Sequence, residues 1–364
     1  MKRLSCLIAL SSLMLASGSM ASSADAQLVQ KTYQLAMDKW ALDMRVATTP
    51  ADREKAWEAR PDAATFAKKM WDQIGNSLTE EWSIEPAAWF LLTTQGLIVT
   101  NTNGSTTPVF AKENEAIRTA VVSYHMNSVK LVPMCVALVA DKDPRGLVIL
   151  EKIQASHTDK KIQGVAALGA AMRLKDIGDD REILKRRIDY LRKAIIQSAD
   201  VDISGTTVAK LAEEELYIIR FLSKGSTAPE LTGVDAAGRP LALSTYKGKI
   251  VVLLFWNSNV AEVARVVEIT KALEQKYRGK PVVILGVNND PLEKLRTLQG
   301  DGTVSWTNFS DPGNKLSTIY RIGTWPLVYV LDKENKIRHA GAPGSFVELT
   351  ADALLAEGKP APAK

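Results

Sequence analysis

Apolar residues recur every three or four positions along the first two thirds of the chain. Between residues 28 and 222, segments such as Ile162, Val165 and Leu168 repeat with the period of an α-helix, while the alternation typical of strands is scarce. Turn-forming residues interrupt the pattern at 48–50, 101–108, 141–144 and 178–180. We therefore expect an α-helical domain over residues 27–223.

A second pattern begins after Lys224-Gly225-Ser226. Unbroken apolar runs rich in β-branched residues alternate with segments of helical period, which is typical of buried strands joined by helices. The expected elements are strands at 250–256, 281–287, 327–331 and 336–339, with a last helix at 346–356. Asp290 precedes Pro291 and is expected to cap a further helix. Residues 224–357 are thus predicted to form an α/β domain, a central mixed sheet flanked by helices.

The N-terminus has the three-part layout of a secretory signal peptide. Lys2 and Arg3 precede an apolar stretch, and small residues follow it up to Ala26, after which cleavage is expected. The apolar stretch is too short to span a membrane. Residues 1–26 are therefore predicted to be removed, leaving a secreted or periplasmic protein without a membrane span. Residues 358–364, rich in Pro and Ala, are expected to form a disordered tail.

The cysteines and histidines offer little chemistry. Cleavage would leave Cys135 as the one cysteine, and a single cysteine forms no intramolecular disulfide or dithiol pair. Cys135 lies in an apolar helical segment, where a thiol is usually an inert core residue rather than a nucleophile. His125, His157 and His339 are scattered without ligand spacing, so we expect no metal and no cofactor.

Charge and aromatic content narrow the range of partners only slightly. The net charge of +5 is spread over the whole chain, so no nucleic acid partner is expected. Five tryptophans cluster before residue 90, at positions Trp40, Trp57, Trp71, Trp82 and Trp89. We expect most of them in the core, and a few could form a binding patch.

Several short motifs occur together in the second part of the chain. They are Ala228-Pro229-Glu230-Leu231, Gly238-Arg239-Pro240-Leu241, Tyr246-Lys247-Gly248-Lys249, Leu254-Phe255-Trp256, Tyr320-Arg321-Ile322-Gly323 with Pro326, and Leu331-Asp332. With the order of expected elements, they resemble the thioredoxin fold. Within it, the chain is similar to the redoxin branch of secreted thiol:disulfide interchange proteins and alkyl hydroperoxide reductase/thiol-specific antioxidant proteins. The resemblance covers residues 225–345.

The resemblance fails at the residues that carry the family's chemistry. In the family, the strand ending in Phe-Trp leads within four residues into a Cys-x-x-Cys pair at the start of a helix. Here Val260 and Val263 occupy the two cysteine positions. Asn259 is expected to cap the helix and Glu262 to complete a capping box, which would occupy the amides that lower the pKa of a thiol. The vestigial active-site loop consists of Trp256, Asn257, Ser258, Asn259, Val260, Glu262 and Val263.

A proline after the loop matches a second family feature. The resemblance implies that Pro326 is cis and faces the vestigial loop, exposing backbone groups that pair with an extended peptide. Trp325 and Leu327 flank this proline and would make the groove more apolar. Trp325 could either pack in the core against Trp256 or be an exposed binding contact. Trp325, Pro326 and Leu327 are the candidate binding residues.

Three functions are compatible with these observations. The leading hypothesis is a redox-inactive thioredoxin-like protein that binds a protein or an extended peptide segment. The second is a thiol-dependent oxidoreductase or peroxidase of the redoxin type, acting through Cys135 or through the thiols of a partner. The third is an interaction protein that acts through its helical domain.

Overall fold

A computed structural model describes residues 22–260 and 262–357. The chain divides between Ala212 and Glu213 into two compact units. The predicted signal peptide, up to residue 21, and the predicted tail 358–364 lie outside the described residues. The predicted cleavage site after Ala26 falls in the first turns of the first helix, where Ala26 itself is buried.

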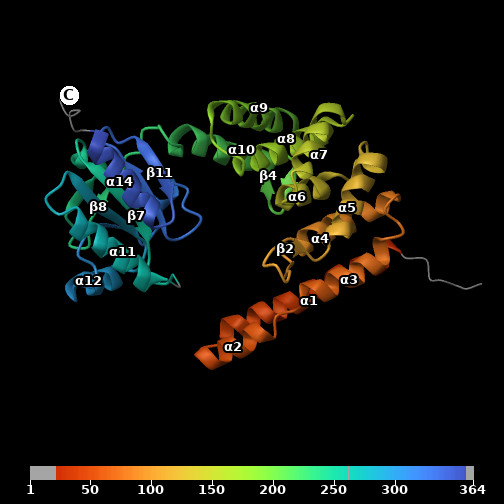
Figure 1. Cartoon of the computed structure of the whole chain (residues 1–364), viewed down its shortest axis with the longest axis horizontal. Helices are drawn as coiled ribbons and strands as arrows, with labels where there is room; N and C mark the ends of the chain where they lie inside the picture. Colours follow the sequence, from red (N-terminus) through yellow and green to blue (C-terminus); the bar gives the residue numbers. More distant parts are fainter. Residues whose placement is uncertain (1–21, 261, 358–364) are drawn as a thin grey trace, which may run out of the picture. The chain divides into compact units, whose positions relative to one another are not determined.

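The first unit consists of helices joined by short turns and two small hairpins (Figure 1). The helices are α1 (Ser23–Val46), α2 (Pro50–Glu58), α3 (Ala63–Ile74), α4 (Ile84–Thr94), α5 (Ala111–Ala120), α6 (Val132–Ala140), α7 (Arg145–Ser156), α8 (Lys160–Lys175) and α9 (Arg181–Ser198). The hairpins pair β1 (Ile98–Thr100) with β2 (Thr106–Pro108), and β3 (Asp202–Ile203) with β4 (Thr206–Thr207). Helix α10 (Val208–Tyr217) follows. The predicted helical character of this region is confirmed.

Helix α8 forms the centre of the first unit. Small residues along it allow neighbouring helices to approach closely, since a Cβ atom added at Gly164 would lie 1.9 Å from Oγ of Ser198 on α9. Residues on all sides of α8 are buried, so its weak amphipathic character follows from being covered on every side.

The prediction that most early tryptophans lie in the core is wrong. Trp57 is 57% exposed, and Trp40, Trp71, Trp82 and Trp89 are each half-buried. Four of these rings contact an aromatic ring of another helix. Trp40 on α1 meets Trp57 on α2 edge to face at 6.0 Å between ring centroids, and the Arg60 guanidinium lies over both rings.

The second unit is built on a five-stranded sheet of order β11-β10-β7-β8-β9. Its strands are β7 (Ile250–Trp256), β8 (Val282–Asn288), β9 (Thr307–Ser310), β10 (Leu327–Leu331) and β11 (Ile337–Gly341). β7, β8 and β9 run parallel, whereas β10 is antiparallel to β7 and to β11. A separate hairpin joins β5 (Thr232–Val234) to β6 (Pro240–Ala242), and the helices are α11 (Val263–Lys276), α12 (Leu292–Gly300), α13 (Lys315–Ile319) and α14 (Ser345–Glu357) (Figure 1). This is the mixed, helix-flanked sheet of the thioredoxin fold, as predicted.

The central strand β7 is buried on both faces. Val251, Leu253 and Phe255 contribute to one core, while Val252, Leu254 and the other alternate residues contribute to the opposite core. This two-sided burial explains why the strand is an unbroken apolar run rather than an alternating one.

No helix among residues 22–260 and 262–357 combines the length and the apolar character that crossing a membrane requires.

Candidate functional site

The candidate site lies where β7 ends and β10 begins. In the antiparallel pair, Leu327 on β10 is opposite Phe255 on β7. Because the two strands are antiparallel, the loop that follows β7 and the segment that precedes β10 lie at the same end of the sheet. The sheet thus brings the vestigial loop close to the predicted binding segment, although about 70 residues separate them in the sequence.

The first residue of the vestigial loop belongs to the core. Trp256 is fully buried, and its ring packs against Trp306 with 5.6 Å between centroids. Its indole N–H donates to the Asn308 side-chain oxygen at 2.8 Å. Trp256 is therefore a core residue at the start of the loop and is not accessible to a partner.

A carboxylate at the end of β8 fixes the middle of the loop. The backbone N–H and the hydroxyl of Ser258 both donate to Asp290, at 2.9 Å each. The Asn288 side chain also donates to Asp290, at 2.8 Å. Asp290 is 2% exposed, and a buried carboxylate needs several donors of this kind to remain in place.

This contact corrects the prediction for Asp290. Helix α12 begins at Leu292 with Pro291 as its N-cap residue, and no side chain caps it. The Asp290 carboxylate points to Ser258 instead of to the helix. The sequence signal was that of a capping residue; the partner 32 residues away could not be found from local spacing.

The predicted cap of α11 is also wrong. The Asn257 side chain accepts a hydrogen bond from the Asn259 N–H at 3.0 Å, and this turn delays the start of the helix to Val263. Glu262 precedes the helix without a side-chain capping bond. Its exposed carboxylate pairs with Arg265 at 3.2 Å.

The two positions that match the family's cysteines lie at and just before the start of α11. Val263 is the first residue of α11, and Val260, half-buried, lies three residues earlier. Val263 packs against the core beneath the helix. No cysteine occurs in the sequence between Glu213 and Lys364, so this site offers neither a thiolate nor a disulfide.

The predicted binding segment has the expected cis bond between Trp325 and Pro326. Trp325 is half-buried and packs with Ile322 and Leu327 against the core that contains Phe255. Trp256 belongs to the core on the other face of the sheet, so the predicted packing of Trp325 on Trp256 is wrong. Phe255 and Trp256 are successive residues of β7 and point to opposite faces of the sheet. Trp325 packs on the face of Phe255 and is therefore separated from Trp256.

Backbone groups beside this proline are open to a partner. Gly323 and Thr324 are exposed, and the N–H groups of residues 323–325 make no hydrogen bond to any residue that the structure describes. An extended segment could pair with such groups as an added strand does.

The remaining thiol of the described chain is far from reactive. Cys135, on α6, is 1% exposed, and burial raises the pKa of its thiol to about 12. The thiolate, which is the nucleophile, is therefore disfavoured at neutral pH. No group of three or more His, Cys, Asp or Glu side chains that could hold a metal ion lies within the described ranges.

Comparisons with known proteins agree with this fold. The AhpC/TSA family model matches residues 224–340. A chloroplastic peroxiredoxin Q of Sedum lineare is 30% identical over 127 residues, covering 32% of this chain and 67% of that relative. The thiol-disulfide oxidoreductase ResA of Bacillus cereus is 26% identical over 114 residues, covering 31% of this chain and 66% of the relative.

Two solved structures are similar to the same third of the chain. The thioredoxin domain of a thiol-disulfide oxidoreductase from Bacteroides vulgatus is 23% identical, with a TM-score of 0.34, covering 36% of this chain and 98% of that one. A secreted thiol-disulfide isomerase from Corynebacterium glutamicum is 17% identical, with a TM-score of 0.33, covering 35% and 84%.

The strand order of its sheet and the family match define the second unit as a thioredoxin-like domain. Through residues 224–340 the chain belongs to the AhpC/TSA family of redoxins, and its relatives include peroxiredoxins and thiol-disulfide oxidoreductases.

Proposed function

We propose that this protein is a redox-inactive redoxin that binds an extended protein segment at the edge formed by residues 257–260 and 324–326. The binding surface would consist of the loop 257–260, which is hydrogen-bonded to Asp290, the N–H groups of residues 323–325 and the half-buried ring of Trp325. We further propose that the protein acts in the periplasm or outside the cell, as its N-terminal sequence suggests.

The observation that carries this proposal is the loop itself. Val260 and Val263 occupy both cysteine positions, and Ser258 is hydrogen-bonded to the buried Asp290. Such a loop has no thiol for redox chemistry, and its hydrogen bonds to Asp290 would limit its motion. Rigid surfaces lose little conformational entropy on binding.

The alternative of a thiol-dependent enzyme would have to rely on Cys135 or on the thiols of a partner, and Cys135 is poorly suited to that role. That thiol is buried, and its pKa is raised to about 12. It also belongs to the first unit, outside the family match. The kinship with oxidoreductases therefore supports the fold more strongly than it supports the chemistry.

Activity assays test the redox-inactive half of the proposal. We expect purified protein to accelerate neither the reduction of insulin disulfides by dithiothreitol nor the consumption of peroxide beyond the rates in buffer alone. Cys135→Ala should give the same result. Turnover that depends on Cys135 would refute the proposal.

Crosslinking tests the binding half. A photo-reactive amino acid at Thr324 or Asn259, both exposed, should give discrete adducts in intact cell envelopes, and Trp325→Ala should remove them. The same photo-reactive group at Arg278, exposed on another part of the unit, is the matched control. Equal adducts from position 278, or adducts that survive Trp325→Ala, would contradict the assignment of the surface.

A further inference from the structure

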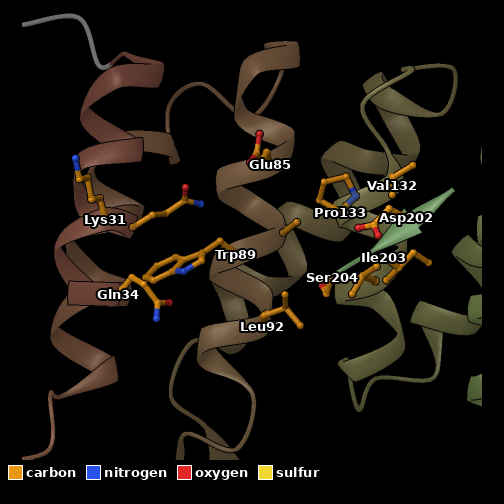
Figure 2. Close-up of a pocket in the computed structure, with 13 residues that line it drawn as sticks. Lys31, Gln34, Glu85, Trp89, Leu92, Val132, Pro133, Asp202, Ile203 and Ser204 are labelled. Atoms are coloured by element: carbon orange, nitrogen blue, oxygen red, sulfur yellow. The ribbon is translucent and has the colours of Figure 1, made fainter. Parts of the chain in front are cut away.

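A pocket of about 560 Å³ lies in the helical unit, independent of the redoxin site. Helices α1, α4 and α6 and the short strand β3 line it (Figure 2). Its apolar wall is formed by Ala88, Trp89, Leu92, Val132, Pro133, Val136 and Ile203. Trp89 extends from α4 towards α1, beside Gln34, and Leu92 is 42% exposed. The wall therefore presents apolar surface that no described residue covers.

Strand β3 offers an open backbone edge to this pocket. The two-residue turn of its hairpin makes Ile203 and Thr206 the hydrogen-bonded pair, so the N–H and C=O of Asp202 point away from β4. The neighbouring bond from the Val208 N–H to the Val201 carbonyl, at 2.9 Å, agrees with this alternation. Neither backbone group of Asp202 bonds to a described residue.

The free backbone groups of Asp202 face the pocket. Asp202, Ile203 and Ser204 line the pocket, whereas no residue of β4 does. The pocket therefore lies on the side of β3 that is away from β4, which is the side to which the free groups of Asp202 point.

Three ionisable side chains surround the pocket without ion-pair partners among the described residues. They are Lys31 on α1, Glu85 on α4 and Asp202 on β3. The two carboxylates favour a cation near α4 and β3, and Lys31 favours an anion or a carbonyl at the opposite wall (Figure 2). The side-chain amides of Gln30 and Gln34, four residues apart on α1, also line this wall and suit backbone groups.

We propose that this pocket binds an extended peptide segment that adds to β3, inserts one large apolar side chain between α4 and α6, and carries a Lys or Arg towards Glu85 and Asp202. A helical ligand would leave the Asp202 backbone groups unpaired, because the backbone groups along a helix are already bonded to one another. An apolar small molecule would leave the two carboxylates without a counter-charge.

The test uses a phage-displayed library of random linear peptides, panned on the full chain. Enriched sequences should share a large aliphatic or aromatic residue with a basic residue nearby. Val136→Trp, which fills the pocket, should weaken a synthetic hit peptide about tenfold or more. Leu92→Lys, at a partly exposed position, should have the same effect and serves as a second variant if Val136→Trp fails to fold.

Charge and backbone are tested separately with the same hit peptide. Asp202→Asn retains an acceptor for the Gly205 N–H, which bonds to the Asp202 carboxylate at 3.1 Å, and should weaken binding several-fold through the lost charge. Glu85→Gln should do likewise, whereas Glu54→Gln on exposed α2 should change nothing. N-methylation of the one peptide amide that pairs with the Asp202 carbonyl should abolish binding, whereas N-methylation of the two neighbouring amides should be tolerated, as expected for strand pairing.

Failure of the library to yield such peptides would overturn the proposal. So would hits that bind folded Val136→Trp or Leu92→Lys unchanged, a helical bound peptide, or equal tolerance of N-methylation throughout. Concentration-dependent self-association that Leu92→Lys abolishes would assign the pocket to a second copy of the chain instead.

Discussion

Ser258 and Asp290 join the loop after β7 to the loop after β8 through two hydrogen bonds of 2.9 Å. Asp290 is almost fully buried, and Asn288 supplies a further donor. Two segments that are far apart in the sequence are therefore joined through one buried carboxylate.

Replacing Asp290 tests how far the fold depends on this contact. Asp290→Asn leaves one acceptor oxygen for several donors, and we expect the free energy of unfolding to fall by about 1–3 kcal/mol. Ser258→Ala removes only the hydroxyl bond and should cost about 1 kcal/mol. Urea denaturation measures both changes, and hydrogen exchange at residues 257–260 should accelerate in step. Unchanged exchange in Asp290→Asn would show that the loop is held by something else.

Gly286 offers a test of the packing behind the site. A Cβ atom added there would lie 1.8 Å from the side-chain oxygen of Asn308, the atom that accepts the Trp256 indole N–H. Gly286→Ala should therefore lower the free energy of unfolding by about 1–3 kcal/mol and disturb the Trp256 environment.

Gly300 is the matched control for this substitution. Nothing lies within 4 Å of a Cβ atom added at this position, the last residue of α12. Gly300→Ala should be neutral or stabilise by about 0.4–1 kcal/mol, because it restricts the unfolded chain. Chemical denaturation with tryptophan fluorescence measures both variants. Similar destabilisation by the two substitutions would contradict the proposed clash.

The sequence predicted those elements whose signal is local. β7 and β10 begin and end at the predicted residues, because each is an apolar run bounded by turn formers. β9 (Thr307–Ser310) was not predicted, since its buried Asn308 breaks the apolar pattern. That asparagine is buried to accept the Trp256 N–H, a reason that lies 52 residues away.

The candidate site was predictable only in part for the same reason. The cysteine positions and Pro326 were found by matching motifs. Asp290 carries a strong capping signal, and only the folded sheet shows that Ser258 competes for its carboxylate. Likewise, the alternation of β7 decides that Trp256 and Trp325 contact different cores.

Restoring the cysteines tests whether the site keeps the family's geometry. In the double variant Val260→Cys and Val263→Cys, the thiol at position 260 would precede the N-terminus of α11, where the helix dipole lowers a thiol pKa. We expect the pair to oxidise to a disulfide and to reduce insulin with dithiothreitol faster than the unmodified chain. The single variant Val263→Cys is the control and should show no gain. A double variant that forms no disulfide would contradict this expectation and would show that residues 260 and 263 are not placed as a Cys-x-x-Cys pair is.

Cys135 makes stability depend on pH in a defined window. Burial raises the pKa of its thiol from 9.0 to about 12. Below pH 9 the thiol is protonated in both the folded and the unfolded chain, and its contribution to stability is complete. Between pH 9 and 12 the unfolded chain releases the proton and the folded chain does not, so the free energy of unfolding falls as pH rises. The slope reaches about 1.4 kcal/mol per pH unit at most.

Denaturation of the unmodified chain and of Cys135→Ala across pH 7–11 measures this contribution. Burial also raises the pKa of several tyrosines, Tyr329 and Tyr277 among them, from 10.0 to about 12, so both chains should lose stability as the pH rises past 9. The tyrosines are the same in both chains, and the thiol contribution is therefore the difference between the two curves: between pH 9 and 10 the unmodified chain should weaken more steeply than the variant. Parallel curves in that interval, or rapid labelling of folded protein by a thiol reagent at pH 8, would mean that Cys135 is accessible, and the thiol-dependent alternative would then regain its basis.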